Sequence, residues 1–190
     1  MGQALWFASR ATGLVSMLLL TASMVLGLVG AARLTGASWP RFVVAALHRN
    51  LSLLVIAFLV VHVSTAVIDP YAGIGWVDTV VPFLSVYHPL SLGLGAVALD
   101  LVLALVASSL LRTRLSLTAW KVVHVTAYAC WPVAIVHGLA IGGADTHRLW
   151  VLAVNGACVL AVLVAGGWRV AASHPDTLAR AGGRPEQPRS

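Results

Sequence analysis

The chain alternates between long apolar segments and short polar connections. Five apolar segments stand out, each longer than 20 residues: Leu5–Ala32, Phe42–Val67, Leu90–Leu111, Leu117–Ile141 and Leu149–Val170. About 20 apolar residues are enough for a helix to cross roughly 30 Å of hydrocarbon. The pattern therefore predicts an all-α integral membrane bundle of about five transmembrane helices.

Three regions need separate treatment. Arg10 precedes an apolar run, as in a secretory signal, but this run exceeds the usual 7–15 residues, so we predict a retained helix. The connection Ile68–Pro89 is broken by Pro and Gly, although Val77–Phe83 is apolar enough to form a sixth, re-entrant or interfacial segment. The polar stretch 171–190 is expected to be a disordered basic cytoplasmic tail after a membrane domain of residues 1–170.

Composition supports a membrane protein. The chain is 59% hydrophobic and only 9% charged, with a mean hydropathy of +0.93, whereas soluble domains carry about 25% charged residues. The net charge of +6 is not gathered into a basic stripe, so nucleic acid is excluded as a partner. Cys130 and Cys158 lie in apolar segments and are expected to be buried small hydrophobes rather than a disulfide.

The positive charges predict the orientation. One side of the membrane receives ten of them: Arg33, Arg41, Arg49, Arg112, Arg114, Lys121, Arg169, Arg180, Arg184 and Arg189. The other side receives only Arg10 and Arg148. The positive-inside rule places the ten in the cytoplasm, with the N-terminus outside and the C-terminus cytoplasmic. The expected location is the cytoplasmic (inner) membrane, crossed several times.

Four histidines carry the candidate chemistry. His48 and His62 are 14 residues apart in the second segment, and His124 and His137 are 13 apart in the fourth. The two segments cross the membrane in the same direction, and each histidine pair spans about 20 Å of helix. Two facing helices would therefore form two His–His pairs stacked across the bilayer. Intramembrane ionisable side chains are costly and usually bind or relay something.

Two axial imidazoles are what a low-spin b-type haem requires. Fourteen steps of about 100° leave His48 and His62 about 40° apart on one face, whereas thirteen steps separate His124 and His137 by about 140° on a straight helix. We expect a kink at Pro132 to bring the latter two together. The competing interpretation is a non-redox membrane protein in which the histidines relay protons or the chain anchors a complex.

Further polar residues are weaker candidates. Arg10, Arg49, Lys121 and Asp100 could contact haem propionates or ligand histidines, although topogenic charge and helix packing explain them as well. Asp100 could alternatively pair with Arg10. His88, Asp145 and His147 could form an outer site for an electron acceptor, although solvated loop residues are common.

The chain resembles the ferric reductase-like transmembrane family, which includes the membrane cores of NADPH oxidases and the haem subunit of the periplasmic methionine sulfoxide reductase system. The resemblance is carried by LHRNLSLLVIAFLVVHV at 47–63 and AWKVVHVTAYACWPVAIVHGL at 119–139. It implies two haem b groups, held by His48 with His124 on the inner side and by His62 with His137 on the outer side.

The resemblance also implies an oxidoreductase membrane subunit that transfers electrons across the membrane. The family core commonly has six helices, against five here, and no nicotinamide or flavin domain is expected after the fifth. Electrons would then come from a separate cytoplasmic flavoprotein reductase or from membrane quinol. The acceptor would be extracytoplasmic: ferric iron, a flavoprotein or an oxidised protein methionine. Some small family members also bind flavin.

Overall fold

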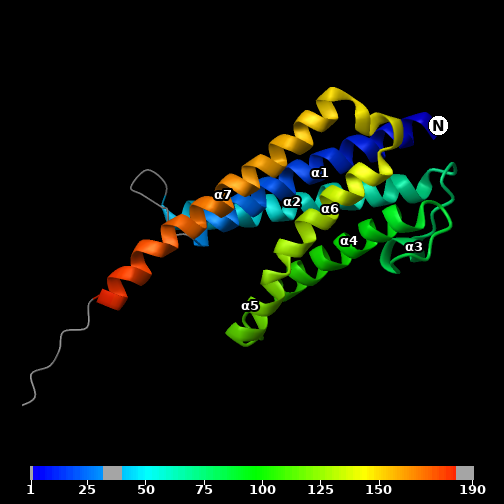
Figure 1. Ribbon diagram of the computed structural model, residues 1–190. Helices are drawn as coiled ribbons and strands as arrows, with labels where there is room; N and C mark the ends of the chain where they lie inside the picture. Colours follow the sequence, from blue (N-terminus) through cyan, green and yellow to red (C-terminus); the bar gives the residue numbers. More distant parts are fainter. Residues whose placement is uncertain (1, 32–39, 183–190) are drawn as a thin grey trace, which may run out of the picture.

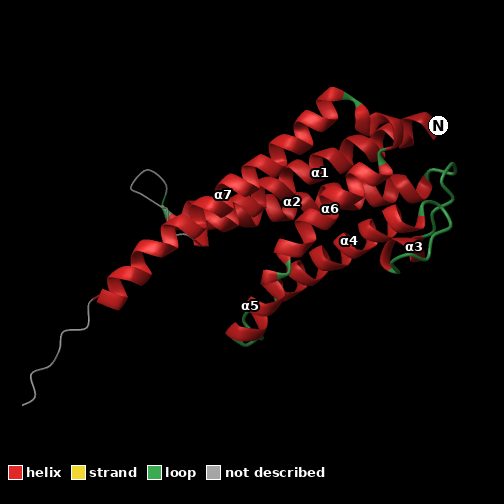
Figure 2. Ribbon diagram, in the orientation of Figure 1, coloured by secondary structure: helices red, strands yellow, loops and turns green. Residues whose placement is uncertain are grey.

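The structure, a computed structural model, describes residues 2–31 and 40–182. These residues form helices and loops, with no strand among them (Figure 2). The elements in chain order are α1 Gly2–Ala31, α2 Arg41–Ile68, α3 Trp76–Val80, α4 Pro89–Leu110, α5 Leu117–Val125, α6 Ala127–Ile141, the 3₁₀ helix η1 Gly143–His147, and α7 Leu149–Gly182.

Within the described residues, five helical segments are long and apolar enough to span a membrane, which confirms the predicted all-α membrane bundle. They are Gln3–Gly30, Arg41–Ile68, Pro89–Leu110, Leu117–Ile141 and Leu149–Ala171. Large apolar side chains such as Phe42, Val60 and Leu163 are 60% or more exposed, as expected where lipid tails rather than water surround a helix.

The spanning helices lie alongside one another, with α1 packed along α2 and α4 packed along α6 (Figure 1). The loops around α3 lie at the end of the bundle that holds the N-terminus, and α5 lies at the opposite end. Because α2 and α6 run in the same direction, residues early in both helices lie at one end of the bundle. This arrangement sets two levels at which the helices face each other.

The buried core joins α1, α6 and α7. Met17, Trp131, Ile135 and Cys158 pack together and are each at most 9% exposed. The indole of Trp131 donates a hydrogen bond of 2.9 Å to the Thr21 hydroxyl. A polar group in hydrocarbon needs such an internal partner, so this bond fixes the approach of α6 to α1.

The two cysteines are free and buried, as expected from their apolar surroundings. The Cys130 thiol lies 3.5 Å from the Ala98 carbonyl of α4. This close approach belongs to the packing of α4 against α6.

The connection between α2 and α4 contains only the five-residue helix α3. Asp78 accepts a 2.8 Å hydrogen bond from the Gly75 amide and so closes the first turn. Phe83 adopts a positive φ of 66° and lays its ring against Gly93, where a Cβ would overlap it. Gly93 is therefore required for this connection to lie on α4. Entry of Val77–Phe83 into the bilayer or its interface stays a prediction.

The fourth span is interrupted at Thr126, between α5 and α6, whereas Pro132 lies inside α6. The expected contribution of a kink at Pro132 stays a prediction, and the interruption at Thr126 is an additional feature between the two histidines. The Thr126 hydroxyl donates to the Val123 carbonyl at 2.7 Å, and such back-bonding by threonine often bends helices. The interruption lies two residues after His124, between this histidine and His137.

Residues 171–182, where the tail was expected to begin, continue α7 as helix. Residues 183–190 lie outside the described residues, as does Arg33. The domain boundary at residue 170 stays a prediction.

Replacing Trp131 by Phe should destabilise the bundle by roughly 1–3 kcal/mol, because it removes the bond to Thr21 and part of a buried ring. The free energy of unfolding in mixed detergent micelles measures this. Trp168→Phe is the control, since Trp168 is 60% exposed and its loss should change stability by no more than about 0.5 kcal/mol. Equal effects of the two variants would contradict the assigned role of Trp131.

Candidate functional site

The structure brings the four intramembrane histidines together as two pairs. His48 of α2 faces His124 of α5, with ring centres 6.3 Å apart and planes at 69°. His62 of α2 faces His137 of α6, with ring centres 6.5 Å apart and planes at 81°. These are the pairs predicted from the two intervals along the sequence.

The separation of the ring centres matches the separation of two imidazole ligands bound to one metal ion. An imidazole nitrogen binds a metal at roughly 2 Å, so two imidazoles on opposite sides of one ion have ring centres about 6 Å apart. Stacked rings would lie closer together, and unrelated side chains have no reason to share one spacing at both levels. Each pair therefore has the ring separation that two imidazole ligands of one metal ion would have.

Three of the four imidazoles are held by backbone carbonyls of a neighbouring helix. The Nδ1–H groups donate hydrogen bonds as follows: His62 to Ser9 at 2.8 Å, His48 to Ser23 at 2.9 Å, and His137 to Ser91 at 2.7 Å. A carbonyl oxygen only accepts, so the hydrogen must be on Nδ1. Nε2 is then left with its lone pair available to a metal, a state that ligand histidines commonly reach through such a bond.

A glycine lies against each of these three imidazoles, four residues after the serine that accepts the hydrogen bond. A Cβ on Gly95 would lie 2.5 Å from Cε1 of His137, and one on Gly13 would lie 2.9 Å from Cε1 of His62. A Cβ on Gly27 would lie 3.5 Å from Cε1 of His48. At Gly13 and Gly95 the missing Cβ leaves room for the ring beside the serine carbonyl, whereas a Cβ on Gly27 would make an ordinary van der Waals contact.

We name these three units Ser-x-x-x-Gly cradles: 9–13 and 23–27 on α1, and 91–95 on α4. Their serines were not among the predicted site residues. The sequence does carry a signal, because the two cradles on α1 are 14 residues apart, the same interval as His48 and His62 on the antiparallel helix α2.

The level of His48 and His124 has an additional polar network, and one of its two histidines is not held by a cradle. The Ser23 hydroxyl lies 2.9 Å from the Ser52 hydroxyl, which donates at 2.8 Å to the His48 carbonyl. His124 is the exception: its buried Nδ1 has no hydrogen-bond partner among the described residues, and its ring stacks on Trp120.

A cavity of about 650 Å³ surrounds His62 and His137, within the range of cofactor sites. Apolar residues of α1, α2, α4 and α6 form most of its wall, and Ile74, Asp78 and Thr79 of the α2–α4 connection also line it. A flat apolar group with polar edges would suit this lining.

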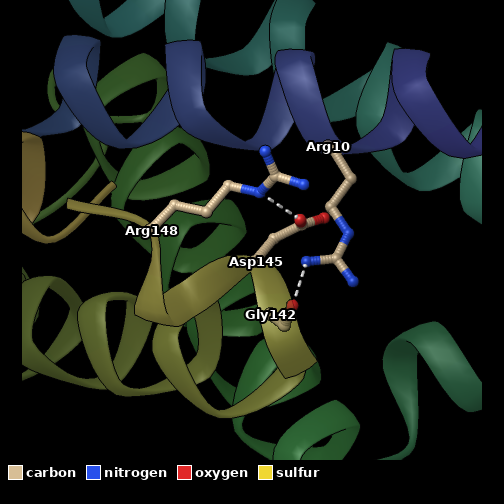
Figure 3. A network of polar contacts seen from close by, with 4 residues as sticks. All are labelled: Arg10, Gly142, Asp145 and Arg148. Carbon is tan, nitrogen blue, oxygen red and sulfur yellow. Dashed lines mark hydrogen bonds and ion pairs between the residues drawn. The ribbon is translucent and has the colours of Figure 1, made fainter. Parts of the chain in front are cut away.

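Arg10 also lines the cavity. Its guanidinium donates to the carbonyls of Gly142 at 2.8 Å (Figure 3) and Ile141 at 3.3 Å. A cation is favourable there, because the carbonyl end of α6 carries partial negative charge. Nearby, Arg148 pairs with Asp145 at 2.8 Å. The expected alternative in which Asp100 pairs with Arg10 is not what the structure shows.

The other predicted residues do not converge. Asp100 is half-buried in α4, Arg49 and Lys121 are exposed, and Asp145 lines the cavity. His88 and His147 are exposed. Within the described part of the chain, no three His, Cys, Asp or Glu side chains form a group that could hold a metal ion. An acceptor site made of His88, Asp145 and His147 stays a prediction.

Residues 12–135 match the family described as ferric reductase like transmembrane component. The chain belongs to this family. The match includes three of the paired histidines and ends just before His137. No curated protein and no solved structure matches the chain. Membership in the ferric reductase-like family supports a component of membrane electron transfer.

Gly95→Ala should displace the His137 imidazole, break its bond to Ser91 and lower the thermal unfolding temperature in detergent, because overpacking typically costs about 1–3 kcal/mol. Gly138→Ala is the control, since a Cβ on Gly138, next to the same histidine, would meet nothing within 4 Å. That variant should be neutral or slightly stabilised. A Gly95→Ala protein as stable as the control would contradict the cradle at this position.

Proposed function

We propose that the chain is a b-type cytochrome of the cytoplasmic membrane that transfers electrons through two bis-histidine haems. His48 and His124 would hold the inner haem, and His62 and His137 the outer one. The observation that carries the proposal is the repeated geometry: two imidazole pairs with ring centres 6.3 and 6.5 Å apart, at two levels of one bundle.

The residues present fit this cofactor. Three imidazoles present a free Nε2 because a backbone carbonyl fixes the hydrogen on Nδ1, and the outer pair opens into a cavity of about 650 Å³. Haem iron with two imidazole ligands exchanges single electrons and leaves no coordination position for oxygen. The helices set the separation of the sites: His48 and His62 lie about 20 Å apart along α2.

The residues around the histidine pairs would have separate roles in holding the cofactor. The cradles hold the ligand rings in one orientation, and the apolar lining excludes water from the outer site. Arg10 places a positive charge at the cavity wall while remaining bound to the end of α6. It is therefore the candidate for contact with a haem carboxylate at the outer level.

The bonds to the cradles argue against the competing proton relay. A relay requires each imidazole to accept a proton on one nitrogen and release it from the other to a further acceptor. Here Nδ1 of His62 and of His137 donates to a backbone carbonyl, which does not take up and pass on a proton under ordinary conditions. Such a bond favours a fixed ligand over a proton carrier.

The direction of transfer follows from the charge asymmetry. The end of the bundle that holds Arg41, Arg49, Arg112, Arg114 and Lys121 is placed in the cytoplasm by the positive-inside rule. Electrons would then pass from a separate flavoprotein or quinol to the inner haem, to the outer haem, and to an extracytoplasmic acceptor. Ferric iron, a flavoprotein and an oxidised protein methionine are the candidate acceptors.

The ligand assignment predicts haem content. His62→Ala or His137→Ala should reduce the pyridine haemochrome value from two haems per chain to about one, because each outer ligand serves a single iron. His48→Ala should remove the inner haem instead, and His147→Ala, at an exposed histidine outside both pairs, should retain two. Wild-type protein without haem from haem-replete cells would overturn the proposed function.

The ring planes predict an electron paramagnetic resonance signature. Axial imidazoles with planes near perpendicular, here 69° and 81°, leave two iron d orbitals almost equal in energy. The oxidised protein should therefore give highly anisotropic low-spin ferric signals with a large maximal g value. His62→Ala should retain only the inner signal, whereas rhombic signals typical of parallel imidazoles would contradict the pair geometry.

A further inference from the structure

His124 is held differently from the other three paired histidines. Its buried Nδ1 has no acceptor among the described residues, and the same is true of Nε1 of Trp120. The two rings stack with centres 4.6 Å apart and planes at 20°. Residues four apart on a helix share one face, so Trp120 covers one face of the His124 ring.

A positively charged side chain also contacts this stack of rings. The guanidinium of Arg112 lies 4.7 Å from the centre of the Trp120 ring, within the range of a cation–π interaction. Guanidinium, indole and imidazole therefore form a continuous column. It begins on the exposed connection between α4 and α5 and ends at a ring that faces His48 at 6.3 Å.

The residues around this column are basic and lie on an exposed part of the bundle. Residues 111–119 are all exposed, and α5 lies beside the end of α4 and apart from α7 (Figure 1). Arg112, Arg114 and Lys121 are exposed, and the sequence from 101 to 144 contains no Asp or Glu. We name Arg112, Arg114, Trp120 and Lys121 the basic tip.

We propose that the basic tip docks the acidic face of a soluble, reduced flavoprotein, and that Trp120 couples this donor to the inner site through its contact with His124. The inference rests on the proposed function and names the donor's docking surface. Charge complementarity favours a redox protein with an acidic face. Topogenic charge alone explains neither the position of Arg112 on the Trp120 ring nor the stacking of that ring on His124.

The step transfers one electron. The flavin hydroquinone of the donor loses an electron and a proton and becomes a neutral semiquinone, and the proton passes to solvent. The electron reduces ferric iron at the inner site to ferrous iron. Trp120 is neither oxidised nor reduced, so it is a positioning and coupling residue rather than a carrier.

The test uses the haem-loaded full chain in zwitterionic nanodiscs, with flavodoxin hydroquinone as an acidic flavoprotein probe under anaerobic stopped flow. Arg112→Gln/Arg114→Gln should slow the second-order reduction roughly tenfold at low salt and flatten its salt dependence. The control Arg41→Gln/Arg169→Gln removes the same charge from α2 and α7 and should retain the wild-type rate. Photoreduced deazariboflavin, a small uncharged reductant, should reduce every variant equally.

Trp120 is tested at saturating flavodoxin. Trp120→Leu should lower the limiting rate while the salt dependence of binding persists, and Trp120→Phe, which keeps a stacked ring, should restore most of that rate. Haem content is measured first, so loss of haem in the wild type counts against the proposed function and not against the docking surface. If the haem-loaded tip variant reacts with flavodoxin at the wild-type rate, the inference is wrong. The inference is also wrong if the only change in that variant is a lower affinity for phosphatidylglycerol vesicles, because the basic tip would then bind lipid.

Discussion

The structure depends on one constraint: the N–H group of an imidazole inside a membrane needs a hydrogen-bond acceptor within the protein. An unpaired N–H in hydrocarbon costs several kcal/mol. For three of the four histidines the acceptor is a backbone carbonyl of a neighbouring helix. At two of these positions, beside Gly13 and Gly95, the ring lies where a Cβ would overlap it. The helix pairs α1–α2 and α4–α6 are thus joined by the same contacts that orient the histidines.

The two levels consequently differ in kind. At the outer level both imidazoles are fixed by cradles on two different helices, and residues of the α2–α4 connection line the cavity. At the inner level only His48 is fixed in this way, and His124 lies two residues before the interruption at Thr126 and stacks on Trp120. In the proposed electron path, a tightly oriented outer site and an inner site in contact with an exposed segment would serve different partners.

Much of this could be predicted from the sequence. The five spans follow from segment length, because lipid imposes a minimum thickness on every crossing, and the pairing of histidines follows from direction and interval. The cradles are harder to predict, since Ser9 and Ser91 contribute backbone oxygen atoms that every residue has. The interruption at Thr126 was not predicted, because proline disrupts a helix more strongly than threonine does. Pro132 nevertheless lies inside α6, and the helix is interrupted two residues after His124. The identity of the redox partners depends on other molecules, which a single chain does not encode.

The distribution of ligands along the chain has a consequence for biogenesis. Both cradles on α1 hold histidines of α2, so the α1–α2 hairpin already contains the hydrogen bonds that orient His48 and His62. The opposite histidines, His124 and His137, are synthesised later, because two further connections separate them from α2. Each histidine pair is therefore incomplete until the span formed by α5 and α6 has joined the bundle. In the cytochrome that we propose, loading of haem would then follow the synthesis of α5 and α6.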